Sequence, residues 1–256
     1  MREVDRTDVS VMAPTEAPNL SLITCTGVWI PFVRDYTRRL VVRAELADPA
    51  TVIVRPAPAP RVPIDAAVLR TVLEERFTDN RRGWPHDPQA TAWFANGAYR
   101  LAVREPRRFV AVGAPIVGPL RDVVVTGTFR KVGGGPGGGY GLIVRDQGPG
   151  PRDGINQGGR YYVFEVGDRG ELGIWRRDDD HWVDIVSWTS SEIVRPGGAT
   201  NVLTVQAVGH QLTFLVNGTS VASVVDSVLA EGAVGIFAGG DLNEVVIDRF
   251  VVQVPS

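Results

Sequence analysis

One cysteine and two arginines are the residues of this chain whose types and spacing suggest covalent chemistry. Cys25 is the only cysteine, and Arg38 and Arg39 follow it after a short segment. A cation close to a thiol favours the thiolate, which is the nucleophilic form of cysteine. Cys25 could therefore be a nucleophile beside these arginines, although a single cysteine at a strand end is more often a small buried apolar residue.

Strands on either side are needed to position these groups. Residues 20–24 and 40–46 are rich in apolar and β-branched side chains over lengths that are typical of buried strands. We expect Cys25 at the end of the first strand and the arginines at the start of the second, facing the same loop. Residues 9–12 predict another short strand, and residues 14–18 a turn.

The same segments resemble a known family. Ser21-Leu-Ile-Thr-Cys25 resembles the Thr-Leu-x-Thr-Cys signature of sortases, the cysteine transpeptidases of bacterial surfaces, and Arg39-Leu-Val-Val-Arg-Ala-Glu-Leu46 resembles the arginine-led strand that follows it. The resemblance covers about residues 3–47 and implies the C-terminal part of a sortase β-barrel. It implies Cys25 as the nucleophile and Arg39, or alternatively Arg38, as the oxyanion and substrate arginine.

The resemblance also implies partners and a location. A sortase acts on a sorting-signal peptide and a cell-wall amine acceptor, and the parent protein would be extracellular or anchored at the cell surface. The family's histidine precedes its cysteine, but none of the 24 residues before Cys25 is a histidine. His86, His181 and His210 all fall in predicted turns. Because proton transfer to a leaving amine typically contributes ~10²–10⁴-fold, we expect a truncated transpeptidase that is inactive alone.

The composition limits the classes of protein and of ligand that fit this chain. Apolar residues make up 44% of the 256 residues and glycines number 29, which is typical of a β-rich globular protein. A formal net charge of −2 gives no electrostatic basis for binding nucleic acid or anionic lipid. The sequence has no signal-peptide pattern and no apolar run of about 18 residues that could span a membrane. No motif predicts a cofactor, and the cysteine and histidines are too widely spaced to predict a metal site.

Proline marks the expected domain boundary. Residues 48–73 contain Pro49, Pro56, Pro58, Pro60 and Pro63. Such spacing favours an extended linker, here between a sortase-like segment, 1–47, and a second domain, 74–256. Within residues 64–76, Asp65 could cap a short helix, or the segment could be a strand entering the second domain.

The second domain is predicted to be an all-β sandwich or jelly roll. Short β-type runs recur about every ten residues, with Gly, Asn and Asp between them. They are residues 97–103, 108–112, 122–131, 139–146, 160–166, 172–177, 181–188, 201–208, 211–217, 219–225, 232–238 and 245–254. Asn217-Gly218 predicts a hairpin turn with positive φ at both residues.

These residues also resemble a family. Phe77-Thr-Asp-Asn80, Gly83-Trp84, Gly97-x-Tyr99-Arg-Leu101, Gly141-Leu-Ile-Val-Arg145, Tyr161-Tyr-Val-Phe-Glu-Val166 and Phe214-Leu-Val-Asn-Gly218 resemble, in this order, motifs of concanavalin A-like lectin/glucanase-type domains. The resemblance covers about residues 74–256. It implies a jelly-roll β-sandwich that binds carbohydrate or another cell-surface ligand, and it carries no catalytic signature.

Aromatic residues are the candidates for ligand contact. Trp175, Trp182 and Trp188, with Tyr161 and Tyr162, could form a platform for sugar rings, with core packing as the alternative. Strand alternation would place Trp182 and Trp188 on one face, together with Asp184 and Val186.

Charged and glycine-rich segments leave further alternatives. Arg160, together with Arg145, Arg176 and Arg177, could bind acidic glycans or only solvate a sheet edge. Residues 178–180 are three aspartates that suggest calcium or a solvated turn. Residues 133–139 lack the ending of a phosphate-binding loop and predict a hairpin loop. The polar loop 146–159 could hold ligand contacts or be a mobile connection.

These observations lead to one main hypothesis and two alternatives. The main hypothesis is a truncated sortase-type segment that carries a jelly-roll domain for carbohydrate or another cell-surface ligand. The alternatives are a purely non-catalytic lectin-like module and an inert fragment of a longer surface sortase.

Overall fold

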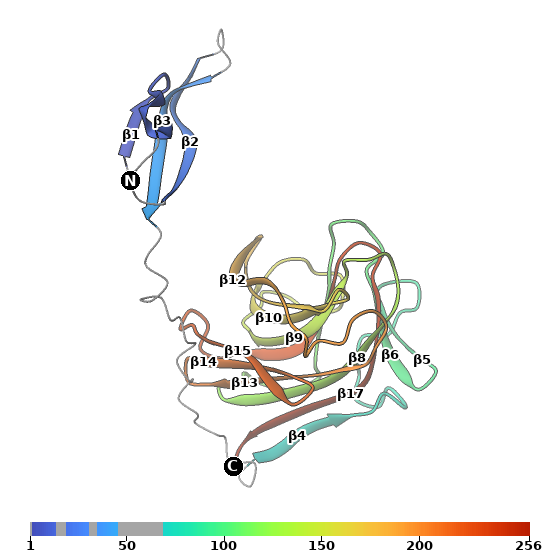
Figure 1. Ribbon diagram of the computed structural model, residues 1–256. Coiled ribbons are helices and arrows are strands. Elements are labelled where there is room, and N and C mark those ends of the chain that lie inside the picture. Colours follow the sequence, from blue (N-terminus) through green and yellow to red (C-terminus); the bar gives the residue numbers. More distant parts are fainter. Residues whose placement is uncertain (1, 14–18, 31–34, 46–68) are drawn as a thin grey trace. The chain divides into compact units, whose positions relative to one another are not determined.

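The chain divides into two compact units, residues 1–61 and 62–256, which are described separately. The computed structural model describes residues 2–13, 19–30, 35–45 and 69–256 (Figure 1). Within these ranges the secondary structure is β-strand, apart from one short 3-10 helix. No helix in the described part of the chain is long and apolar enough to cross a membrane.

The first unit is a small antiparallel sheet. Its strands are β1 (Arg2–Asp5), β2 (Asn19–Ile30) and β3 (Asp35–Glu45), with β3 in the centre. The strand predicted over residues 9–12 is instead a 3-10 helix (Val9–Met12), because the Asp8 side chain accepts a hydrogen bond from the Ser10 amide and caps it. The turn predicted over residues 14–18 lies outside the described residues.

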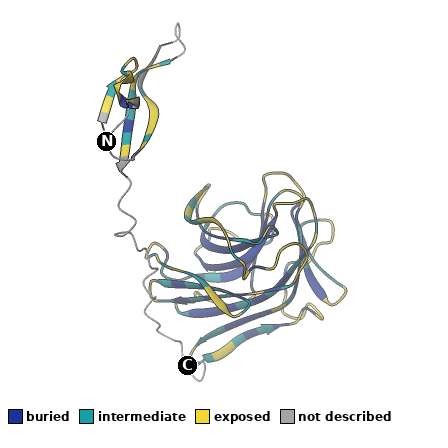
Figure 2. Cartoon of the chain, viewed as in Figure 1, coloured by how far each residue is buried: buried dark blue, intermediate teal, exposed yellow. Residues whose placement is uncertain are grey.

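The predicted burial of the strand over residues 20–24 is wrong. Leu20, Leu22 and Ile23 are exposed, while Val41 on the central strand is buried (Figure 2). Three strands cannot cover both of their own faces, so apolar side chains on an edge strand stay in contact with solvent.

The second unit is a sandwich of two antiparallel sheets (Figure 1). The larger sheet has the order β15-β14-β13-β8-β17-β6-β5, with β4 paired to β17, and the smaller has the order β12-β11-β10-β9-β16-β7. The strands of the larger sheet are β4 (Leu69–Glu75), β5 (Ala92–Ala95), β6 (Ala98–Ala102), β8 (Val123–Gly133), β13 (Asn201–Val208), β14 (Gln211–Val216), β15 (Thr219–Val225) and β17 (Glu244–Pro255). Those of the smaller sheet are β7 (Val110–Gly113), β9 (Gly139–Asp146), β10 (Arg160–Gly167), β11 (Glu171–Asp178), β12 (His181–Ser190) and β16 (Ala233–Gly239).

The jelly-roll prediction is confirmed. Each of the predicted β-type runs is a strand with bounds close to the expected ones, and β5 is an additional strand. Buried residues lie along the strands of both sheets (Figure 2), and their side chains form one continuous core. Phe164 of β10 packs against Phe214 of β14 at a ring-centroid distance of 5.6 Å, so aromatic pairs join the two layers.

The expected linker extends too far. Strand β4 begins at Leu69, inside the segment 48–73, and pairs antiparallel with β17. Leu73 is buried in the core, and this burial explains why the segment is a strand and not the alternative helix. Residues 48–68 lie outside the described residues.

Two predicted turns have different outcomes. Asn217 and Gly218 have φ values of 50° and 82°, as predicted for the tight turn between β14 and β15. The glycine-rich loop after β8 is not a hairpin loop, because β8 and β9 belong to different sheets. It carries the chain from one layer of the sandwich to the other.

Candidate functional site

Cys25 and Arg39 lie directly opposite each other on β2 and β3. Cys25 is exposed and lies within β2, not at the end of a strand facing a loop. The two residues are therefore close to each other, as predicted. They lie on two paired strands, however, and not at a shared loop.

The guanidinium of Arg39 is already bound within the first unit. Its Nη2 donates to both carboxylate oxygens of Asp35, at 2.7 and 2.6 Å, and its Nη1 donates to the carbonyls of Tyr36 and Arg38. The hydrogen bond with Asp35 is the main reason that the pKa of Arg39 is raised. Arg38, the alternative, pairs with Glu3 at 3.2 Å.

The three histidines belong to the second unit. Nδ1 of His86 accepts a hydrogen bond from the Phe94 amide, His181 contacts Asp180, and His210 is exposed. None of them lies in the part of residues 2–45 that the structure describes. The first unit therefore offers a thiol and an occupied arginine, with no histidine among its described residues.

The outer face of the smaller sheet contains the more developed site. Here a hollow of about 410 Å³ lies on the side of the sheet that faces away from the sandwich core. Side chains from β10, β11, β12 and β16 and from the segment before β7 line it. They include Phe109, Glu165, Trp175, Trp182, Asp184, Trp188 and Phe237.

Two groups of aromatic rings form the walls of this hollow. Trp182 packs edge-on against Phe109 at 5.3 Å and against Phe237 at 5.9 Å. Trp188 packs against Trp175 at 5.4 Å. Trp182 and Trp188 are 37% and 47% exposed, so part of each indole is free to meet a ligand.

The alternation argument for β12 is correct for Trp182, Asp184 and Trp188, which all line the hollow. It is wrong for Val186, which packs against the sandwich core. The pairing of β11 with β12 shifts register on either side of Ile174, and Ile174 pairs with Val186. Such an irregularity changes which face a side chain occupies.

Tyr161 and Arg160 do not line the hollow. Tyr161 is fully buried beneath Trp182, with the Arg152 guanidinium 4.8 Å from its ring, so the core-packing alternative describes it better. Arg160 is bound to Asp178 at 3.1 Å. Because successive residues of a strand face opposite sides, Arg160 lies on the side of the sheet away from Tyr161.

The other arginines have structural partners. Arg145 is buried and donates to the carbonyls of Leu229 and Gly209, and Arg176 pairs with Asp226 at 2.8 Å. The guanidinium of Arg177 lies 5.0 Å from the ring of Trp182, a cation–π contact. These arginines therefore support the sheet and its aromatic rings, and they do not form a solvated edge.

Glu165 of β10 is at the floor of the hollow. Its neighbours across the ladder are Gly141 and Gly173, and a side chain at Gly139 would clash with its Oε1. Nε1 of Trp175 donates to Oε2 at 3.1 Å. Burial raises the pKa of Glu165 to about 8, the Trp175 hydrogen bond partly opposes this increase, and the Glu171 carboxylate adds to it.

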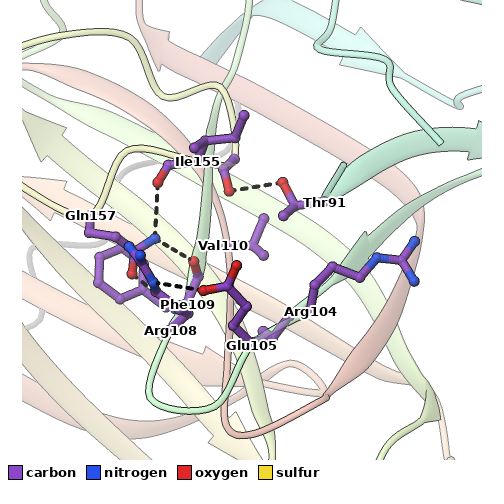
Figure 3. A pocket seen from close by; sticks show the side chains of 10 residues that line it. Thr91, Arg104, Glu105, Arg108, Phe109, Val110, Ile155 and Gln157 are labelled. Atoms are coloured by element: carbon purple, nitrogen blue, oxygen red, sulfur yellow. Dashed lines mark hydrogen bonds and ion pairs between the residues drawn. The ribbon is translucent and has the colours of Figure 1, made fainter. Parts of the chain in front are cut away.

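A smaller hollow of about 120 Å³ adjoins the first and shares Arg108 and Phe109 with it (Figure 3). Gln157 exchanges hydrogen bonds with the backbone of Phe109, and Thr91 donates to the Gly154 carbonyl. The loop 146–159 is further held by the buried pair of Arg152 and Asp146. These contacts tie the loop to the sheet, in contrast to the mobile connection that was the alternative.

The three aspartates at the β11–β12 turn do not form a metal site. Asp178 is bound by Arg160 and Arg176, and Asp179 has a positive φ of 57°. No group of three or more His, Cys, Asp or Glu side chains in the described ranges is arranged to hold a metal ion.

Solved structures share the fold of the second unit. A Bacillus subtilis protein of unknown function with a galectin-like fold is 13% identical, with a TM-score of 0.56 over 73% of this chain and 97% of that chain. The laminarinase catalytic domain of Thermotoga maritima is 10% identical, with a TM-score of 0.52 over 74% and 99%. A β-glucanase of Bacillus licheniformis is 9% identical, with a TM-score of 0.51 over 72% and 98%.

These similarities establish a concanavalin A-like jelly-roll fold. At such identities they concern the fold alone. No protein-family model and no curated protein matches the chain. None of the comparisons supports the sortase resemblance of residues 3–47.

Glu165, Phe109 and Phe237 are site residues that were not predicted from the sequence. A signal for Glu165 was available, because it lies four residues after Tyr161 on the same strand and therefore on the same face. Phe109 precedes β7 and Phe237 lies on β16, whereas Trp182 lies on β12 at the opposite edge of the smaller sheet. These rings meet across the outer face of the sheet, and no local sequence pattern indicates such a contact.

Proposed function

We propose that the second unit binds carbohydrate in the hollow on the outer face of its smaller sheet. The observation that carries this proposal is the convergence of partly exposed Trp182 and Trp188 with a buried carboxyl, Glu165, in a single hollow of about 410 Å³. Indole faces pack against the C–H faces of sugar rings, while a few placed polar groups contact the hydroxyls.

The polar groups around the aromatic rings suit such a ligand. Asp184 lines the hollow beside Trp182, and Arg107 and Arg108 line its other side. Charged and neutral hydrogen-bonding groups around an apolar floor are the usual composition of a small-molecule site. The shared fold of the laminarinase and the β-glucanase is consistent with this proposal, although at their low identity it concerns the fold alone.

The test is binding to a panel of neutral gluco-, galacto-, manno- and xylo-oligosaccharides, followed by calorimetry with the strongest binder. Trp182→Ala and Trp188→Ala should each weaken binding about 10- to 100-fold, or about 1.4–2.8 kcal/mol. Trp93→Ala is the matched control, because Trp93 stacks with Arg104 and lies outside both hollows. Absence of binding across the panel, or an equal loss in the Trp93 variant, contradicts the proposal.

A cysteine transpeptidase activity of the first unit is the second candidate. The observation in its favour is the exposed Cys25 directly opposite Arg39. In this reaction the Cys25 sulfur forms a thioester with a peptide carbonyl, the peptide C–N bond breaks, and the thiol proton leaves with the amine. If the first unit has this activity, mass spectrometry after incubation with a library of sorting-signal peptides will detect an acyl adduct that Cys25→Ser abolishes. The occupied guanidinium of Arg39 argues against this candidate.

A further inference from the structure

Glu165 is the buried ionisable side chain of the hollow, and its surroundings leave one oxygen unoccupied. Oε2 accepts from Trp175, whereas Oε1 has no hydrogen-bond partner among residues 69–256. The side chain is only 6% exposed. Oε1 is not fully enclosed by protein, and Glu165 lines the hollow, so this oxygen is available to solvent or to a ligand there.

Glycines leave the space that this oxygen occupies. A Cβ added at Gly139 would clash with Oε1. A Cβ added at Gly239 would lie 3.0 Å from the same oxygen. Both glycines line the hollow. Two neighbouring strands, β9 and β16, therefore contribute backbone without side chains at the point toward which Oε1 is directed.

We infer that Glu165 is a specificity-determining residue of this hollow, whose protonated carboxyl donates a hydrogen bond from Oε1 to an oxygen of a neutral sugar. The inference rests on the proposed carbohydrate-binding function and adds the chemistry of its central polar contact. A carbonyl oxygen is the better acceptor of the two carboxyl oxygens, so the Trp175 N–H favours Oε2 as the carbonyl and Oε1 as the hydroxyl.

The charges near Glu165 favour the neutral acid. Glu171 of β11 is a negative neighbour and raises the pKa of Glu165 in addition to the effect of burial. Asp184 of β12 lines the same hollow, as do Arg107 and Arg108 from the segment before β7. No ion pair joins any of these to Glu165 in the described part of the chain, and Arg108 pairs with Glu105 at 3.4 Å.

Binding should consequently depend on pH in a defined direction. Below about pH 8 the Glu165 carboxyl keeps its proton and can donate. Above that pH it ionises, loses the O–H and leaves an unpaired charge in the hollow. The affinity for a neutral sugar should then fall, approaching a tenfold loss per pH unit if only the protonated form binds. No histidine, cysteine, lysine or tyrosine lines the hollow, so Glu165 is the group that accounts for a transition in this range.

The experiment measures affinity for the strongest neutral oligosaccharide of the panel between pH 6.5 and 9.5. Wild-type protein should lose at least tenfold in affinity across this range. Glu165→Gln keeps a donor in place of the hydroxyl and cannot ionise, so its affinity should not change with pH. Glu165→Leu has no donor and should bind at least tenfold more weakly than wild type at pH 6.5.

Glu171→Gln is the control, because Glu171 adjoins Glu165 but does not line the hollow. It should retain the alkaline loss, displaced slightly toward lower pH. Circular dichroism at each pH establishes that every variant stays folded.

The outcomes separate the inference from the function on which it rests. Binding that depends on Trp182 but not on pH, or the same alkaline loss in Glu165→Gln, overturns the inference and leaves carbohydrate binding intact. Affinity that rises with pH shows that the carboxylate pairs with a cationic ligand and also overturns it. If no member of the panel binds, the proposed function and the inference both fail.

Discussion

The two candidate sites of this chain differ in how far their ionisable side chains are exposed to solvent. Cys25 and Arg39 lie on a three-stranded sheet, and Arg39 is paired with Asp35 near the surface. Glu165 lies beneath tryptophans on a sheet whose other face is already covered by the sandwich core. Both sites contain ionisable groups close together, but only the second removes such a group from water.

Burial, and not residue type, is therefore what gives a side chain unusual chemistry. An exposed ion pair is screened by water and contributes little. A carboxyl under apolar rings with a single N–H partner must either stay protonated or destabilise the fold when it ionises. The comparison can be tested by changing the burial or the charge at each place.

The largest expected effect is on the pH dependence of folding stability. Glu165 has a pKa of about 8 when folded and an ordinary value of 4.5 when unfolded. Between these values the folded protein holds a proton that the unfolded chain releases, so stability falls as pH rises from about 4.5 to about 8. Relative to wild type, Glu165→Gln should gain on the order of 4–5 kcal/mol over that range and no more above it.

Urea unfolding of both proteins at pH 4.5, 6, 7, 8 and 9 measures this difference. Glu192→Gln is the control, because Glu192 is exposed, and its difference from wild type should not grow with pH. A constant difference between Glu165→Gln and wild type would show that Glu165 is ionised in the folded protein at neutral pH.

A smaller effect is expected from filling the space beside Glu165. In Gly139→Ala the new methyl group would clash with Oε1 and force the carboxyl away from its place over β9. Overpacking of this kind typically costs about 1–3 kcal/mol, which thermal or urea unfolding at pH 6 would detect. Gly135→Ala, in the loop before β9, is the matched control, because nothing lies within 4 Å of its added methyl group. Equal stability of the two variants would mean that Glu165 is loosely held.

Much of the fold could be predicted because each strand of the sandwich carries its own local signal. Alternation, length and turn residues identified β8 to β17, and Asn217-Gly218 specified its turn through the positive φ of both residues. The prediction was wrong where local pattern competes with long-range pairing. Strand β4 lies at the end of a proline-rich segment, and only its pairing with β17 and the burial of Leu73 identify it as part of the sheet.

The candidate site was predicted only in part for a similar reason. Trp175, Trp182 and Trp188 were found from their type and spacing, and the structure places them in one hollow. Phe109 and Phe237 could not be found, because they meet Trp182 from the opposite edge of the smaller sheet, a contact that no local pattern encodes. Val186 was placed on the wrong face because a register shift in a strand pair leaves no mark in the sequence.

The smallest effect is expected at Cys25, where the environment predicts ordinary reactivity. The thiol is exposed, and the guanidinium opposite it donates its terminal N–H groups to Asp35 and to backbone carbonyls. Cys25 should therefore react with a maleimide in the native protein at a rate within about threefold of that of another exposed strand cysteine, since reactivity requires an activating environment. The double variant Cys25→Ser, Ser220→Cys provides that comparison, because Ser220 is exposed on β15. A rate more than tenfold faster for Cys25 that Arg39→Ala abolishes would show that Arg39 activates the thiol in spite of Asp35. That result would reverse the comparison of the two sites and favour the transpeptidase candidate for the first unit.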